Sequence, residues 1–173
     1  RSATREELEL FHTKDYIDYV FKAEGRGIQL LDGGDTPVFP GVYEASAHVA
    51  GAALDGLTQI IEGNCARTLQ PIGGLHHAAR GGAAGFCVFN DLGVVVEALR
   101  HEYGITRVGY LDIDVHHGDG SQSLFWNNKK VFFASTHQGG GFYPGTGKEN
   151  EKGKYNNITN IPMEAGTNSE QYL

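Results

Sequence analysis

The sequence predicts an α/β fold built on a central parallel β-sheet. Two largely apolar segments, RVGYLDID at 107–114 and VFFAST at 131–136, have the composition of buried strands, because strands covered on both faces of a parallel sheet are mostly apolar along their length. A helical pattern precedes the first strand, and a helical turn is expected at 122–126, between the two. This alternation of strands and helices is typical of a parallel sheet.

The N-terminal segment is predicted to be helical. Thr4 and Glu7 have capping-box spacing, and Thr13 stands as an N-cap ahead of an apolar face. The segment GGDTPVFPG at 33–41 contains glycines and prolines that break regular structure, so a loop is expected there. Apolar residues then recur at helical spacing over 42–61, which predicts a long helix.

The middle of the chain is predicted to run from strand to loop to helix. ARTLQPI at 66–72 is predicted to be a short strand, and it leads into the glycine-flanked loop GGLHHAARGGAAGFC at 73–87. Asn90 or Asp91 is expected to cap the helix that follows. Because ligands gather at the C-terminal ends of parallel strands, the loops after the strands are where we expect chemistry.

Composition excludes several classes of function. The formal charge of -7 offers no cationic surface for nucleic acid or anionic lipid. No apolar run approaches the roughly 20 residues that cross a bilayer, and the N-terminus is too polar for a signal peptide. We therefore expect a cytoplasmic protein that binds neither nucleic acid nor membrane, with Cys65 and Cys87 both reduced.

A metal-ligand pattern follows the first predicted strand. In an extended strand Asp112, Asp114 and His116 project to one face, since side chains alternate with period two. A carboxylate and an imidazole suit a divalent ion such as zinc, which predicts that Asp114 and His116 bind one ion. Asp112 is expected behind them, and the glycines beside Asp119 predict a tight turn. The alternative is that these are ordinary turn and loop residues.

His76 and His77 form a second histidine pair, in the 73–87 loop. Adjacent histidines point in opposite directions in extended backbone, so both can serve one site only in an irregular loop, which the surrounding glycines permit. The alternative is a surface loop with two titratable side chains. A metal-like HH motif after another strand favours a shared functional site.

Four motifs in this order resemble the histone deacetylase superfamily, especially its acetoin-utilisation and acetylpolyamine-type members. They are GGLHHAARGGAAGFCVFND, YLDIDVHHGDG, STHQGGGFYPGTG and GKYNN. The resemblance covers the whole chain and implies a three-layer arginase/deacetylase-like fold around the parallel sheet. Because the chain opens on Arg1 and stops where a helix begins, we expect residues 1–173 to be one partial domain, the N-terminal half.

The resemblance implies a zinc-dependent amide hydrolase. Asp114 and His116 would hold one catalytic zinc ion. His77 would act as general base and then as acid, with His76 as its electrostatic partner. The resemblance also implies that a carboxylate orients each histidine: Asp112 would orient His76, and Asp119 would orient His77.

The resemblance also implies substrate contacts and a second ion. Phe86 and Tyr143 would wall a tunnel for the acetyl-lysine methylenes, Gly85 would accept the substrate amide N–H, and Asp35 would hold the substrate backbone at the rim. A structural potassium ion would involve residues of both predicted strands: Asp112, Asp114, His116, Ser135 and Thr136.

Three functions follow as candidates. The first is deacetylation of acetylated lysine or of small acetylated amines and polyamines. The family's third zinc ligand and catalytic tyrosine match no position here, so we expect this chain alone to turn over poorly. The second candidate is a non-catalytic metal-binding module. The third is a binuclear manganese ureohydrolase, which needs additional carboxylates. The sequence does not determine the oligomeric state.

Overall fold

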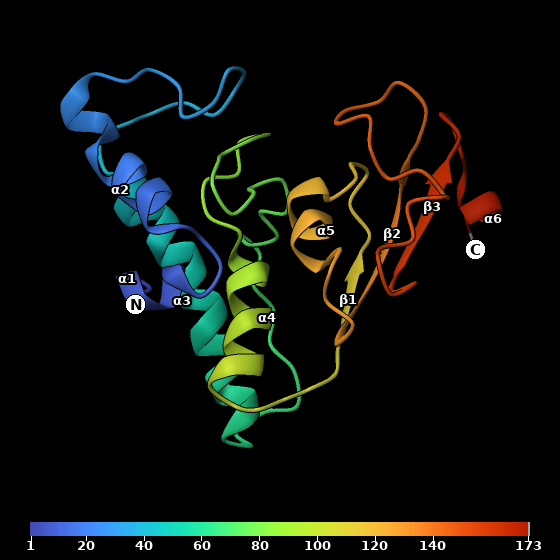
Figure 1. The fold of residues 1–173 in the computed structure, drawn as a ribbon, viewed down its shortest axis with the longest axis horizontal. Coiled ribbons are helices and arrows are strands. Elements are labelled where there is room, and N and C mark those ends of the chain that lie inside the picture. The colour runs from blue at the N-terminus through green and yellow to red at the C-terminus, as the bar shows by residue number, and fades with distance from the viewer. Residues whose placement is uncertain (173) are drawn as a thin grey trace. The chain divides into compact units, whose positions relative to one another are not determined.

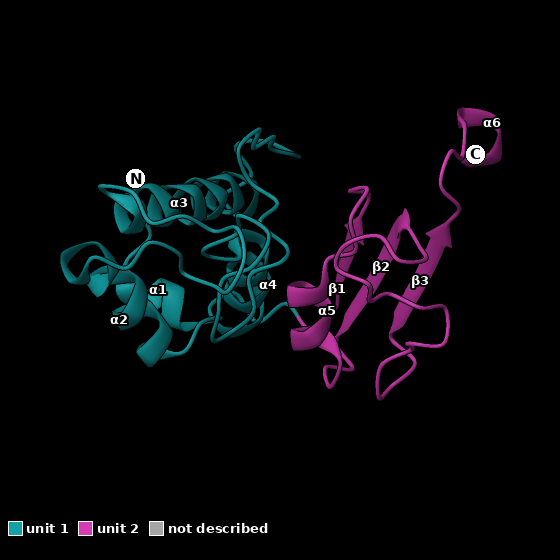
Figure 2. Ribbon diagram, turned by 90° about the horizontal axis from the view of Figure 1, so that it is seen from above, with its two compact units in different colours: residues 1–105 teal, residues 106–173 magenta. Residues whose placement is uncertain are grey.

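The computed structural model describes residues 1–172 and divides the chain into two compact units, Arg1–Ile105 and Thr106–Leu173 (Figure 2). Unit 1 is helical and unit 2 holds the sheet (Figure 1). Unit 1 contains α1 (Arg5–Glu9), α2 (Lys14–Ala23), the 3-10 helix η1 (Glu24–Arg26), α3 (Val42–Ile61) and α4 (Asp91–His101). Unit 2 contains β1 (Val108–Asp112), α5 (Asp119–Phe125), β2 (Val131–Gln138), β3 (Ile158–Met163) and α6 (Ser169–Tyr172).

The predicted helix starts are confirmed. The Thr4 hydroxyl accepts the Glu7 N–H at 3.2 Å, and the Glu7 carboxylate accepts the Thr4 N–H at 2.7 Å. This reciprocal pair is a complete capping box, which satisfies two of the donors that a helix start leaves unpaired. Thr13 caps α2 through the Tyr16 N–H, and α3 has the predicted bounds.

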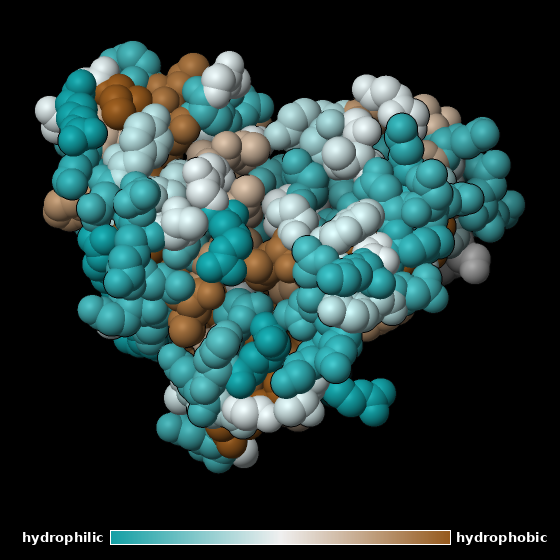
Figure 3. Space-filling view, in the orientation of Figure 1, coloured by the Kyte–Doolittle hydropathy of each residue, from teal (hydrophilic) through white to brown (hydrophobic). Residues whose placement is uncertain are grey.

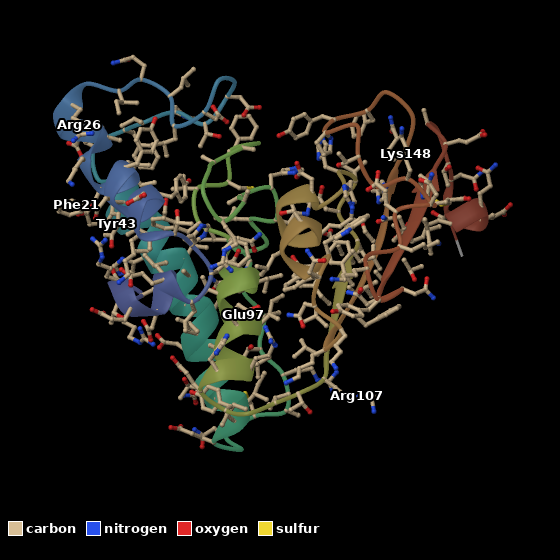
Figure 4. All side chains as sticks on the ribbon, viewed as in Figure 1. Phe21, Arg26, Tyr43, Glu97, Arg107 and Lys148 are labelled. Carbon is tan, nitrogen blue, oxygen red and sulfur yellow. The ribbon has the colours of Figure 1, made fainter. Side chains whose placement is uncertain are left out.

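Aromatic and small residues pack the helices of unit 1 together. Phe21 of α2 meets the ring of Tyr43 edge to face at 5.2 Å (Figure 4), and Tyr43 meets Phe89 in the same way at 5.8 Å. Gly93 of α4 lies against the ring of Phe11, where an added Cβ would collide with ring carbons. The α4 backbone therefore approaches Phe11 more closely than any side chain would permit.

The predicted strand at 66–72 is wrong, because this segment is irregular. A strand needs a neighbour for its backbone N–H and C=O groups, and residues 66–72 pair with none. Leu69 is 91% exposed and Ile72 73% exposed, so the apolar side chains that suggested a strand gain no burial here. The Gln70 amide, which donates to the Val49 carbonyl at 2.8 Å, holds the segment to α3.

Unit 2 is built on a parallel three-stranded sheet in the order β1-β2-β3, which confirms the predicted α/β class. β3 was not predicted from the sequence. Its buried positions include the polar Asn160, and Pro162 interrupts the run, so the segment lacks an apolar strand pattern. The segment is a strand because it pairs with β2, and its composition alone does not indicate one.

One face of the sheet is buried and the other is open. Tyr110 of β1 and Phe133 of β2 lie 5.3 Å apart between ring centroids, and Phe125 of α5 packs on Tyr110 at 5.7 Å. On the opposite face, Leu111 is 70% exposed and Phe132 51% exposed. Apolar residues also break the otherwise hydrophilic surface in Figure 3. The core of unit 2 is therefore the α5 side of the sheet.

Two expectations from composition concern the whole chain. No disulfide joins Cys65 and Cys87. Within residues 1–172, no helix combines the length and apolar character that a bilayer crossing requires.

Asn157, just before β3, joins three backbone segments. Its side-chain amide lies 2.9 Å from the Phe125 carbonyl, 3.2 Å from that of Asn128 and 3.0 Å from that of Val131. The residue is 7% exposed, so water cannot readily replace these bonds. Asn157 therefore fixes the end of α5 to the starts of β2 and β3.

We expect Asn157→Ala to lower the free energy of unfolding by about 2 kcal/mol, because buried carbonyl groups lose their donor. Chemical denaturation of the variant and the parent protein measures this change. Asn127→Ala is the matched control, since Asn127 is an exposed asparagine in the loop between α5 and β2 and should change stability by less than about 0.5 kcal/mol. Equal effects of the two substitutions would contradict the role of Asn157.

Candidate metal and histidine site

The chain turns at the end of β1. β1 ends at Asp112, so the prediction of an extended strand through His116 is wrong. The Asp112 carboxylate accepts the Asp114 N–H at 3.1 Å, and the Asp114 carboxylate accepts the His116 N–H at 2.7 Å. Each aspartate thus captures the backbone two residues on, a pattern that replaces strand pairing with a turn.

This turn brings the two predicted metal ligands together. Asp114 Oδ1 and His116 Nδ1 lie 3.2 Å apart, and their side chains are 51% and 37% exposed. Two ligands about 2.0 Å from a tetrahedral zinc ion are separated by roughly 3.3 Å, so the pair fits one ion. Within residues 1–172, no cluster of three His, Cys, Asp or Glu side chains can hold a metal.

Two aromatic residues lie beside His116. The Phe142 ring stacks on the imidazole at 4.8 Å with an interplanar angle of 11°, and the Tyr143 ring meets it at 6.0 Å and 72°. Tyr143 was predicted from the sequence and Phe142 was not. The adjacent aromatic pair in GGGFYPG was the only signal for Phe142, and the pair does not indicate which ring stacks on the histidine.

A buried polar network lies behind His116. His117 Nε2 contacts Gln122 Oε1 at 3.0 Å, and its Nδ1 contacts the Thr146 hydroxyl at 2.7 Å. The amide oxygen can only accept, so Nε2 carries the proton and Nδ1 accepts from Thr146. Burial lowers the pKa of His117, which favours this neutral form.

His137 on β2 repeats this arrangement. Its Nε2 donates to the Gly147 carbonyl at 3.0 Å, and its Nδ1 accepts from the Ser135 hydroxyl at 2.8 Å. Burial lowers the pKa of His137 as well. A Cβ added at Gly147 would lie 2.5 Å from His137 Nε2 and 2.6 Å from the His117 ring. The two imidazoles therefore pack against Gly147, which lies in the same loop as Phe142 and Tyr143.

The residues predicted for potassium lie at the ends of β1 and β2. Asp112 and Ser135 are directly paired in the parallel register, and both are buried. The Ser135 hydroxyl donates a hydrogen bond to His137, so the lone pairs of its oxygen remain available to a cation. Thr136 follows on β2 and is half-buried.

In unit 1, His76 and His77 lie side by side in an irregular loop, as predicted. Their ring centroids are 4.2 Å apart with an interplanar angle of 57°, and both residues are buried. Asn90, the N-cap of α4, donates its side-chain amide to the Ala78 carbonyl at 3.0 Å. The start of α4 therefore supports the histidine loop directly.

Asp91 holds the chain just before the histidines. Its carboxylate accepts the Gly74 N–H at 3.0 Å and the Leu75 N–H at 2.8 Å. A Cβ at Gly73 would collide with this carboxylate, so a glycine is required for the close approach. Burial raises the pKa of Asp91, and the backbone N–H groups partly oppose that shift.

α2 and the residues before it support the other end of the loop. His12 Nε2 accepts the Asn90 N–H at 3.0 Å, the Thr13 N–H donates to the Arg80 carbonyl at 2.9 Å, and the Tyr16 hydroxyl donates to the Val88 carbonyl at 2.8 Å. His12 is buried among aromatic rings. Burial lowers the pKa of His12 to about 4.

The predicted substrate residues Gly85 and Phe86 form a tight turn. Ala84 and Cys87 pair across it through two backbone hydrogen bonds, and both central residues have positive φ, 54° at Gly85 and 65° at Phe86. Positive φ at both positions is what a type I′ turn requires. For a bulky residue this conformation costs about 1–3 kcal/mol, and such strain is common at functional sites.

The predicted site residues thus fall into two groups. Asp35, His76, His77, Gly85 and Phe86 belong to unit 1, whereas Asp112, Asp114, His116, Asp119, Ser135, Thr136 and Tyr143 belong to unit 2. Each predicted pair of histidine and carboxylate has its histidine in unit 1 and its carboxylate in unit 2. The pairing of His76 with Asp112 and of His77 with Asp119 stays a prediction.

Unit 2 is a parallel α/β unit with a carboxylate and an imidazole in contact after a strand end, and unit 1 carries a loop with two adjacent histidines. The chain matches the family described as the histone deacetylase domain over residues 1–173, and it belongs to that family. It is 40% identical to the acetoin utilization protein AcuC of Bacillus subtilis and 35% identical to the histone deacetylase RPD3 of Saccharomyces cerevisiae. These alignments cover 100% and 99% of this chain but 47% and 42% of the relatives.

Solved structures agree on the fold. An HDAC homolog from Aquifex aeolicus matches with a TM-score of 0.89 and 34% identity, over 98% of this chain and 48% of that one. An HDAC homolog complexed with SAHA matches with the same values. The arginase/deacetylase-like fold is therefore confirmed, and the chain spans about half the length of these relatives.

The low pKa of His12 predicts an acid-sensitive fold. Above pH 6.5 His12 is neutral in both folded and unfolded chains, whereas between pH 6.5 and about 4 only the unfolded chain takes up the proton. Stability is therefore lost as the pH falls through this window, by about 3 kcal/mol at pH 4. Denaturant titrations at several pH values measure this loss. His12→Gln should flatten the pH dependence, and an equal slope in both proteins would contradict the assignment.

Proposed function

We propose that this chain forms part of a zinc-dependent deacetylase that hydrolyses the amide of acetylated lysine or of small acetylated amines. The contact between Asp114 and His116 carries the proposal, because it offers an oxygen and a nitrogen ligand at the separation that one zinc ion needs. Membership of the histone deacetylase family supports the reaction class.

Asp114 and His116 would hold the zinc ion. When bound, the ion supplies Lewis acidity toward the amide carbonyl and toward a water molecule. The protein's part is to orient these two ligands: the N–H groups of Asp114 and His116 fix the turn, and Phe142 stacks on the imidazole. Ligands held in this way lose little freedom on binding the metal.

His77 would take the proton from the attacking water and return it to the leaving amine, and His76 would stabilise the charge that develops. An imidazole suits both steps because its ordinary pKa lies near neutral pH. Burial and the supports from Asn90 and Asp91 hold both rings in a fixed loop. Asp112 and Asp119 would orient the rings of His76 and His77.

The remaining residues would bind substrate and a structural cation. Phe86 and Tyr143 would cover the aliphatic stem of the acetylated amine, since flat aromatic faces bury methylene groups well. Gly85 would accept the substrate amide N–H and Asp35 would bind the substrate at the rim. A potassium ion would be held by oxygens at the ends of β1 and β2: those of Asp112, Asp114, His116, Ser135 and Thr136.

The metal assignment has a direct test in the natural gene product. We expect Asp114→Asn and His116→Ala each to weaken zinc binding by more than about 100-fold. Loss of a residue that only hydrogen-bonds to a metal ligand costs about 10–100-fold, and loss of the ligand itself should cost more. Competition with a chromogenic chelator measures this affinity. His48→Ala, an exposed position on α3, is the control and should leave zinc affinity unchanged. Unaltered affinity in both ligand variants would refute the site.

The chemical assignment is tested by turnover. We expect the natural gene product to deacetylate an acetyl-lysine peptide or an acetylated diamine, and the ratio of kcat/KM for the two identifies the substrate class. His77→Ala should lower kcat by about 10²–10⁴-fold with zinc content unchanged, the range for loss of a general base.

His101→Ala, on the exposed end of α4, is the control for turnover and should leave kcat as it is. Zinc binding without turnover on either substrate would favour the non-catalytic module. Two manganese ions per chain would favour the ureohydrolase.

A further inference from the structure

A buried threonine links the two turns of unit 1 that carry the predicted substrate residues. Thr36 is 1% exposed, although its neighbour Asp35 is exposed. The Thr36 hydroxyl donates to Asp32 Oδ2 at 2.7 Å and accepts the Phe86 N–H at 3.2 Å. Fifty residues of sequence separate Thr36 from Phe86, so this contact exists only in the folded chain.

Asp32 fixes the first turn. Its Oδ1 accepts the Gly34 N–H at 3.0 Å and the Thr36 N–H at 3.1 Å. Burial acts to raise the pKa of Asp32, but the bonds from Thr36 and the backbone outweigh it, so the pKa is lowered and the carboxylate stays ionised. The Thr36 backbone N–H donates to Asp32, and the Leu31 N–H donates to the Thr36 carbonyl at 2.8 Å. Asp35 therefore lies within a closed hydrogen-bonded turn.

The second turn needs outside support. Phe86 has a φ of 65°, which a bulky residue rarely adopts, and yet the residue is 70% exposed and gains little from packing. Strain of this kind persists only where the surroundings enforce it. The Ala84–Cys87 pairing encloses the turn but leaves the Phe86 N–H pointing away, and the Thr36 hydroxyl accepts that group.

We propose that Thr36, oriented by Asp32, is a positioning residue that holds Phe86 in its strained conformation and sets its place relative to Asp35. The inference rests on the proposed function, in which Phe86 and Asp35 bind the acetylated amine. Because the hydroxyl donates to a carboxylate and accepts an N–H at the same time, a residue without that hydroxyl breaks both links. Thr36 touches no reacting atom, so its effect falls on substrate binding.

The link itself is tested by amide hydrogen exchange in the natural gene product. In the wild-type protein we expect the Phe86 amide to exchange at least about tenfold more slowly than an unprotected amide, although its side chain is exposed. Thr36→Val keeps the shape and removes the hydroxyl, and it should accelerate this exchange about tenfold or more. Thr36→Ser restores the hydroxyl and should restore protection. Exchange at the unprotected rate in wild type would overturn the link, even if Thr36→Val does not fold.

The consequence for binding is tested by steady-state kinetics on an acetyl-lysine peptide. Thr36→Val should raise KM on the order of tenfold and change kcat by less than about threefold, because lost positioning weakens binding without touching the chemistry. Thr36→Ser should return KM to within about threefold of wild type, a rescue that a general loss of stability would not produce. An unchanged KM, or a fall in kcat alone, would overturn the positioning role.

The two hypotheses fail in different ways. A wild-type protein that shows no turnover contradicts the proposed function, and with it the consequence for binding, whereas amide exchange still decides whether Thr36 supports the Phe86 turn. A wild-type protein that turns over, with Thr36→Val equal to it in KM and in exchange, keeps the proposed function and removes the inference.

Discussion

Carboxylates that accept backbone N–H groups organise the turn around Asp35, the segment before the paired histidines and the turn after β1. Asp32 closes the turn around Asp35, and Asp91 holds Gly74 and Leu75 just before the paired histidines. Asp112 and Asp114 turn the chain after β1. A charged acceptor makes a stronger hydrogen bond than a neutral one, so a single side chain can fix a segment that has no helix or strand of its own.

In unit 2 a carboxylate and a buried imidazole together hold the loop that follows β2. Glu151 accepts the Gly147 N–H at 3.1 Å and the Gln122 amide at 2.7 Å, while His137 donates to the Gly147 carbonyl. The loop that carries the aromatic residues beside His116 is thereby tied to β2 and α5. A buried polar network holds one geometry only when its members are satisfied, and here the proton positions of both imidazoles follow from their partners.

Glycines occupy positions where the backbone comes close to a side chain. Gly73 against Asp91, Gly93 against Phe11 and Gly147 against two histidines each leave no room for a Cβ. Phe86, in contrast, is a bulky residue with a positive φ, a conformation that favours glycine. The residue is exposed, while the Thr36 hydroxyl accepts its backbone N–H.

The sequence by itself predicted α1 to α4, the two strands with apolar patterns and the family. Capping residues and apolar spacing are local signals, so the start of α1 and the bounds of α3 could be predicted. The types and order of Asp114, His116, His76 and His77 indicated the family.

Tertiary structure decided what depends on partners. β3 forms because β2 pairs with it, while 66–72 lacks a partner and stays irregular. Asp114 and His116 converge through a turn rather than along a strand, because carboxylates compete with strand pairing for the same N–H groups. Phe142 over His116 and Thr36 beneath Phe86 were unpredictable for the same reason: local sequence does not specify which distant groups meet.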